Sequence, residues 1–186
     1  DGDGIPWRTL PGTHPTKGSF FTRGTTRDPY ARYSEKGVDY IYNMERLLRK
    51  FKTAATLVPQ PVFHPAAQAT KIGVIYFGST SPAMHEALDV LGEQGVMLDA
   101  MRLCAFPFPD VVSDFIAKHD KVFMVEQNRD AQMHALLVNE LAIDPAKMVK
   151  VLHFDGTPIT ARFITNAIAK DLQVLAHSKP EQKEAA

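Results

Sequence analysis

The 186-residue chain has one cysteine, no excess of either charge and no long hydrophobic run. The single Cys104 excludes an internal disulfide framework and a cysteine-based metal or iron–sulfur site within the chain. It is also typical of a reducing compartment, so we expect a cytoplasmic protein. Lys and Arg number 21, as do Asp and Glu, so nothing favours nucleic acid or an anionic membrane as a partner. No apolar run approaches the ~20 residues that span a bilayer, and no basic-then-apolar signal peptide is present.

The common catalytic motifs are missing as well. The chain has no Walker motif, no Gly-x-Gly-x-x-Gly and no Gly-x-Ser-x-Gly elbow. Its seven histidines show no metal-binding spacing, and His153 reads as a core histidine rather than a ligand. Cys104 has no His or Asp partner close in sequence, which argues against a nucleophile. The residues alone therefore predict no complete active site, no catalytic residue and no metal site.

A regular pattern fills the second half of the chain. Short apolar runs at residues 71–78, 96–103, 121–125 and 148–154 read as strands, and a helical pattern follows each of them. Four such repeats with short loops predict an α/β domain with an open, mainly parallel sheet and helices on both faces. We expect the helix after the first strand to be capped by Ser81 and the last helix to be opened by Thr157 and Pro158.

The first third of the chain is less regular. Residues 1–37 are rich in Gly, Pro, Thr and aromatic residues, which indicates a segment that packs against something. An amphipathic helix follows, with its apolar side chains on one stripe (Ile41, Met44, Leu47, Leu48 and Phe51). The prolines of residues 56–68 are typical of a linker between domains.

Ligands tend to bind where parallel strands end, at the carboxyl edge of the sheet. Gly78, Ser79 and Thr80 lie between a strand and a helix start, where free amides and the helix dipole could hold an anion. A tight turn that binds nothing is the more common use of such a segment.

Two further clusters are candidates for ligand or interface contacts. After the third strand, Asn128 and Arg129 belong to a polar run in which Arg129 could grip a phosphate or carboxylate. Alternatively, this run is an ordinary helix start capped by Asn128 or Asp130. The second cluster surrounds Arg23 in an aromatic, Gly-containing loop, for which simple packing is again the alternative.

The same segments resemble the alpha subunits of 2-oxoacid:ferredoxin oxidoreductases, specifically their carboxyl-terminal part. The resemblance rests on residues 3–15, 21–25, 30–33, 43–51, 76–80, 102–109, 125–130 and 151–156. It implies that residues 1–55 end a pyrimidine-binding domain and that residues 56–68 are the linker. Residues 69–178 would form a domain similar to the transketolase carboxyl-terminal domain, and residues 179–186 a frayed tail.

The family reaction is oxidative decarboxylation of a 2-oxoacid with coenzyme A, which gives acyl-CoA, carbon dioxide and reduced ferredoxin. The resemblance favours 2-oxoglutarate as the substrate. It implies that the chain alone is inactive and binds no cofactor, because the family's substrate and cofactor motifs are absent here. Thiamine diphosphate, Mg²⁺, an iron–sulfur cluster and coenzyme A would belong to the complete complex. The expected partners are the remainder of the alpha subunit, a beta subunit and, through the complex, ferredoxin.

The chain would then be a fragment, or one piece of a larger chain, that scaffolds and assembles. Two alternatives remain open. One is a self-sufficient α/β module that binds an anion or nucleotide at Gly78, Ser79 and Thr80. The other is an interaction domain without a ligand site, which predicts an exposed apolar patch around Trp7, Phe20 and Phe21.

Overall fold

The computed structural model describes residues 2–18 and 24–173. It divides into two compact units, Asp1–Val58 with Phe106–Phe108 and Pro59–Ala105 with Pro109–Ala186. Arg23, Phe20 and Phe21 lie outside the described residues, so the expectations placed on them have no structural counterpart. Within the described part, no helix is both long enough and apolar enough to cross a membrane.

The second unit contains a five-stranded sheet in the order β3-β5-β4-β6-β7. Its strands are β3 (Val62–His64), β4 (Ile72–Phe77), β5 (Asp99–Leu103), β6 (Lys121–Glu126) and β7 (Met148–Leu152). Strands β4 to β7 pair in parallel, whereas β3 pairs antiparallel with β5. The predicted open, mainly parallel sheet is therefore confirmed.

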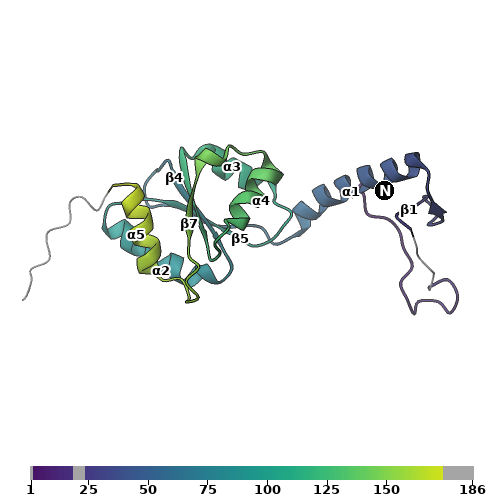
Figure 1. Cartoon of the computed structure of the whole chain (residues 1–186), viewed down its shortest axis with the longest axis horizontal. Coiled ribbons are helices and arrows are strands. Elements are labelled where there is room, and N and C mark those ends of the chain that lie inside the picture. Colours follow the sequence, from purple (N-terminus) through teal and green to yellow (C-terminus); the bar gives the residue numbers. More distant parts are fainter. Residues whose placement is uncertain (1, 19–23, 174–186) are drawn as a thin grey trace, which may run out of the picture. The chain divides into compact units, whose positions relative to one another are not determined.

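Four helices cover the two faces of this sheet. They are α2 (Ser81–Glu93), α3 (Asp110–Lys118), α4 (Gln132–Leu141) and α5 (Ala161–Asp171). Helices α2 and α5 lie on one face and α3 and α4 on the other (Figure 1). Two short 3₁₀ turns, Gly78–Thr80 and Pro145–Lys147, lead into α2 and β7.

The core follows from the apolar runs of the sequence. The interior of β6 is buried on both faces, as a central parallel strand requires. On the α2 and α5 face, Val74, Tyr76, Phe123 and Val125 of the strands join the helix residues of one hydrophobic cluster. On the opposite face Gly73 leaves room for α3, because a Cβ at this position would lie 2.9 Å from the Phe115 ring.

Three local expectations differ from the structure. The stretch expected as linker contains strand β3, whose three residues sit between Pro61 and Pro65. Thr80, not Ser81, occupies the N-cap position of α2, and no side chain caps that helix. Helix α5 begins at Ala161 and is capped by the Thr160 hydroxyl, which accepts a hydrogen bond from Phe163 N at 3.2 Å. Pro158 precedes that cap, since the chain first turns through residues 155–157.

The first unit is built around the 21-residue helix α1 (Gly37–Leu57). Strands β1 (Thr26–Arg27) and β2 (Tyr33–Ser34) form a small antiparallel pair, and Asn43 of α1 donates to Thr26 Oγ1 and Arg27 O. Gly4 has a positive φ and packs on the helix backbone, where a Cβ would lie 2.6 Å from Arg46 O. Two hydrogen bonds hold this segment on the helix. Arg46 Nη1 donates to Gly4 O, and Thr53 Oγ1 donates to Asp3 O.

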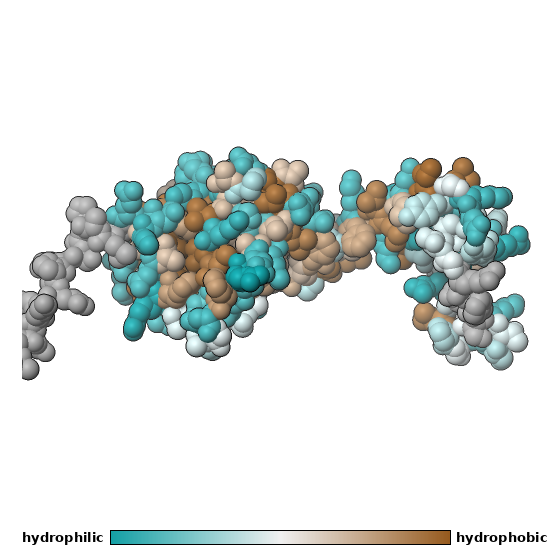
Figure 2. Space-filling model, viewed as in Figure 1, coloured by the Kyte–Doolittle hydropathy of each residue, from teal (hydrophilic) through white to brown (hydrophobic). Residues whose placement is uncertain are grey.

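Helix α1 nevertheless contains no buried residue. Its apolar stripe is open to solvent, with Ile41 58%, Leu48 69% and Phe51 51% exposed. Apolar residues appear along this helix in Figure 2. Trp7 is 91% exposed, as the interaction-domain alternative predicts for this residue.

Candidate functional site

The carboxyl ends of β4 and β6 mark the point where the sheet order reverses. From β4 the chain first adds β5 on one side and then β6 on the other. The crevice at such a switch point is where open α/β sheets usually bind ligands. Gly78, Ser79 and Thr80 follow β4 there, and residues 127–130 follow β6. The structure therefore brings these two predicted clusters together.

Gln127 connects the loops at this switch point. Its Nε2 donates to Ser79 Oγ at 3.0 Å and to Thr80 Oγ1 at 3.2 Å. Its Oε1 accepts from Ile159 N at 3.3 Å, in the loop before α5. Gly78 allows the approach because its φ of +59° suits glycine. The hydroxyls of this candidate turn are thus engaged by a side-chain amide of the same chain.

Glu126, the last residue of β6, is fully buried and caps helix α4. Its Oε2 accepts from Asn128 Nδ2 and Met133 N, and its Oε1 from His134 N, each at 2.8 Å. A carboxylate at a helix amino end is favoured by the free amides and by the helix dipole. Sequence reasoning missed this residue as a site member, although its place directly after a buried strand is a usable signal.

The expected caps of α4 are only partly right. Ala131, with a φ of +52°, occupies the N-cap position and has no side-chain oxygen to offer. Asn128 contributes from farther back, since its Oδ1 accepts from Gln132 N at 3.1 Å. Asp130 does not cap the helix, because its carboxylate pairs with Arg129 Nε at 2.7 Å. The Arg129 side chain is 74% exposed in that pair, and exposed pairs of this kind contribute little stability.

His153 lies next to this region and is 7% exposed. Its amide donates to Glu126 O at 2.9 Å, and its ring packs edge-on against Phe163. Its Nε2 is 3.4 Å from Asp155 Oδ1. The pKa of Asp155 is lowered, first by the Thr157 hydroxyl and then by the Thr157 amide. His153 is therefore held in the core, as its sequence position predicted.

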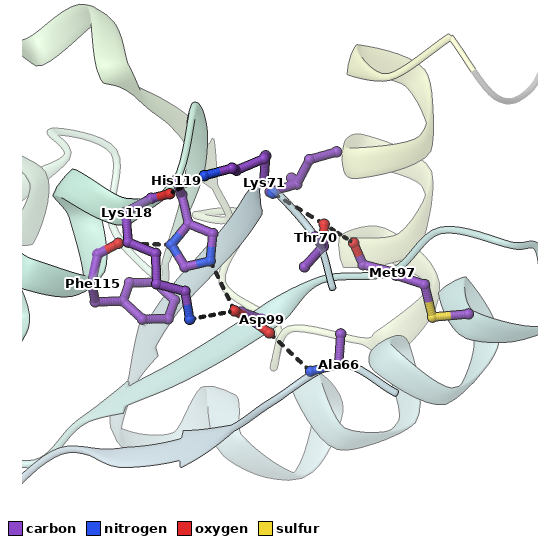
Figure 3. Close-up of polar contacts among 9 residues, drawn as sticks. Ala66, Thr70, Lys71, Met97, Asp99, Phe115, Lys118 and His119 are labelled. Atoms are coloured by element: carbon purple, nitrogen blue, oxygen red, sulfur yellow. Dashed lines mark hydrogen bonds and ion pairs between the residues drawn. The ribbon is translucent and has the colours of Figure 1, made fainter. Parts of the chain in front are cut away.

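A second polar cluster lies around Asp99, the first residue of β5 (Figure 3). Asp99 Oδ2 is 2.8 Å from Lys118 Nζ and 3.1 Å from His119 Nε2, and Asp99 Oδ1 accepts from Ala66 N at 2.9 Å. The fully buried His119 also has Nδ1 2.7 Å from Phe115 O. Burial alone would raise the pKa of Asp99, but the bonds from Lys118, Ala66 and His119 lower it overall.

The Asp99 cluster ties three pieces together at the edge of the sheet where the parallel strands begin. It joins β5 to the segment after β3 and to the end of α3 (Figure 3). Hollows of about 460 and 350 Å³ lie near this edge, and both are lined partly by His64 and Pro65. The described residues include no group of three His, Cys, Asp or Glu side chains that could hold a metal ion.

No protein-family model matches the chain. The chain is 30% identical over 156 residues to 2-oxoacid:ferredoxin oxidoreductase 2, subunit alpha, from Aeropyrum pernix. The matched region covers 81% of this chain and 24% of that protein. The resemblance inferred from the sequence is thereby confirmed. The chain spans about a quarter of the length of this curated relative.

A solved structure shares the fold. It is the 2-oxoglutarate:ferredoxin oxidoreductase from Magnetococcus marinus with 2-oxoglutarate, coenzyme A and succinyl-CoA bound. The two structures superpose with a TM-score of 0.79 over 93% of this chain and 30% of that chain. The identity over that match is 20%.

Proposed function

We propose that this chain is the carboxyl-terminal part of the alpha subunit of a thiamine-diphosphate-dependent 2-oxoacid:ferredoxin oxidoreductase, and that it assembles the enzyme rather than performing its chemistry. The observation that carries this proposal is the identity of 30% over 81% of the chain to an alpha subunit of that class. The shared fold over 93% of the chain supports it.

The reaction of the complete enzyme would be oxidative decarboxylation of a 2-oxoacid with coenzyme A and oxidised ferredoxin. The products would be acyl-CoA, carbon dioxide and reduced ferredoxin. We favour 2-oxoglutarate as the substrate, since the structural relative holds 2-oxoglutarate and succinyl-CoA. The single cysteine supports a cytoplasmic enzyme.

The geometry at the switch point supports an assembly role. Gln127 engages Ser79 and Thr80, and Glu126 is saturated by donors from α4 and Asn128. Arg129 is paired with Asp130 on the surface. Side chains that satisfy one another hold loops in a fixed arrangement, which suits a docking surface better than a reaction centre.

The proposed cofactors would then be held elsewhere in the complex. Residues 2–18 and 24–173 offer no group of three His, Cys, Asp or Glu side chains for the Mg²⁺ ion of thiamine diphosphate. The exposed apolar stripe of α1 is the surface we assign to the remainder of the alpha subunit. The beta subunit, and ferredoxin through the complex, are the other proposed partners.

The test is reconstitution under anaerobic conditions. The chain is produced alone and together with a beta subunit and the preceding part of the alpha subunit as separate polypeptides. We expect the chain alone to be inactive and the assembly to reduce ferredoxin with 2-oxoglutarate only when coenzyme A is present, and faster than with pyruvate. Failure of the chain to associate with either polypeptide would contradict the assembly role, and a preference for pyruvate would contradict the substrate.

A further inference from the structure

The carboxyl end of β5 places a charged residue in an otherwise apolar row of the sheet. Arg102 stands opposite Val62 of β3 on one side and Tyr76 of β4 on the other. Residues opposite one another on neighbouring strands project from the same face, with the strands about 4.8 Å apart. That face is the one covered by α2 and α5, because Tyr76 belongs to their cluster.

One nitrogen of the Arg102 guanidinium lacks a hydrogen-bond partner. Its buried Nε–H group donates to no side chain or carbonyl of residues 2–18 and 24–173. Arg102 also takes part in none of the ion pairs formed within those residues. A buried donor without an acceptor is destabilising, and nearly all such donors in proteins are paired with protein, water or an ion.

Hydroxyl and imidazole side chains lie on the same face of the sheet as Arg102. Burial raises the pKa of the Tyr76 phenol, while the Ser81 hydroxyl and the positive charge of Arg102 pull it down. The Tyr76 hydroxyl is 3.5 Å from His85 Nε2 on α2. His85 in turn lies edge-on to His64 of β3, with ring centroids 5.1 Å apart. An arginine, a tyrosine hydroxyl and two histidines thus gather at one corner of the sheet, which we call the Arg102 corner.

Solvent reaches this corner from the edge of the sheet. Val62, beside Arg102, is 43% exposed, and Cys104 beyond it is exposed. The hollow of about 460 Å³ opens next to His64 and His85, with Asp89 of α2 as its acidic wall residue. The corner therefore combines the buried, unpaired Nε–H group of Arg102 with neighbouring polar side chains, and the hollow borders its two histidines.

We propose that the Arg102 corner binds a small oxyanion, phosphate or carboxylate, on the guanidinium of Arg102 with the Tyr76 hydroxyl as a second donor. The planar guanidinium presents paired N–H groups that match two oxygens of such an anion. This site is separate from the Gly78–Thr80 turn, whose hydroxyls are already engaged by Gln127. It stands independently of the proposed enzyme, because it rests on this chain alone.

The test titrates the complete chain with inorganic phosphate, and in parallel with acetate, against chloride at constant ionic strength. We follow Tm and the NMR signal of the Arg102 Nε–H group. A saturable rise in Tm with a shift of that signal is expected, since a ligand that binds the folded state stabilises it. Saturation by acetate alone would assign a carboxylate ligand, and saturation by phosphate a phosphate ligand.

Three variants separate a specific site from the general effect of salts. Arg102→Met, which keeps the length of the side chain, should weaken the apparent Kd about tenfold or more. Tyr76→Phe, which keeps the ring packing, should weaken it by a smaller factor. Arg162→Gln removes the same charge from an exposed position on α5 and should leave the titration unchanged.

Two results would overturn the proposal. One is a wild-type response to phosphate and acetate no different from that to chloride. The other is a saturable response that Arg102→Met retains in full, which would place the anion elsewhere. The Nε–H signal reports on the wild-type chain directly, so the proposal remains testable even if one variant fails to fold.

Discussion

At the scale of single residues, a buried carboxylate and a partly buried one, at opposite ends of the sheet, have similar roles. Glu126 holds the start of α4 where β6 ends, and Asp99 holds the end of α3 where β5 begins. Both receive several donors, which is what a buried charge requires. The order of residues places each at a strand terminus. Asp99 takes partners 20 and 33 residues away in the sequence, so the sequence alone does not identify them.

Removing the charge of Glu126 should loosen the start of α4. Glu126→Gln keeps the shape of the side chain but loses the charge-assisted bonds to Met133 N and His134 N, at a cost of about 2 kcal/mol. Urea unfolding measures this loss. Glu140→Gln, an exposed change on the same helix, should change stability by less than about 0.5 kcal/mol. Equal effects of the two changes would contradict the capping role.

The Asp99 cluster should make stability depend on acid. Because the pKa of Asp99 is lowered in the folded chain, its carboxylate stabilises the folded state at pH values above the ordinary aspartate pKa of about 4. This stabilisation is lost as the pH falls through the lowered pKa. Asp99→Asn should cost about 1–2 kcal/mol near neutral pH, with the difference from wild type shrinking below about pH 4.

Urea unfolding at a series of pH values gives this difference directly. Asp120→Asn, on an exposed carboxylate two residues after Lys118, should show no such convergence. A difference between wild type and Asp99→Asn that stays constant down to pH 2 would show that the carboxylate charge is not what stabilises the cluster.

At the scale of elements, the apolar runs predicted the parallel strands well. Strand β6 ends one residue beyond its expected limit, and β5 starts three residues late, because residues 96–98 are irregular. Strand β3 escaped prediction for a physical reason. It has three residues between two prolines, and a segment that short carries no periodic signal of its own. Only its pairing with β5 makes it a strand.

Helix α1 shows an amphipathic pattern without a partner for its apolar side. Leu48→Glu should hardly change the stability of the chain by itself, by less than about 0.5 kcal/mol, because this side chain is 69% exposed. It should weaken association with the partner proposed above, the remainder of an alpha subunit, at least about tenfold, since a carboxylate would then be buried there. Analytical ultracentrifugation or titration calorimetry measures the association of the wild-type and the Leu48→Glu chains.

The matched control for this helix is Arg49→Glu. It introduces the same side chain at the neighbouring exposed position, outside the apolar stripe. If both variants associate as tightly as wild type, the stripe of α1 is not the docking surface.

At the scale of the whole molecule, the two units differ in how much they bury. All five strands of the sheet and its hydrophobic cluster belong to the second unit, whereas α1 has no buried residue. A fragment of residues 59–178 should therefore unfold cooperatively. A fragment of residues 1–58 should show no cooperative transition, because residues 2–18 and 24–58 form no apolar core of their own.

Circular dichroism on heating tests both fragments, with the complete chain as the reference. A sharp transition in the short fragment would contradict this division. The mainly parallel sheet could be anticipated from periodicity. The meeting of Gln127 with Ser79, Thr80 and Ile159 could not, because it depends on the order in which the strands assemble.

The short strand β3 has a consequence for solubility. It occupies the outer hydrogen-bonding edge of β5, which would otherwise present a row of free amides and carbonyls to other chains. Pro61 and Pro65 bracket β3 itself, and a proline cannot donate to an added strand. The segment that leads into the sheet thus also closes this side of it against strand addition. Chains shortened past residue 64 would regain that open edge, and with it a tendency to form intermolecular sheets at high concentration.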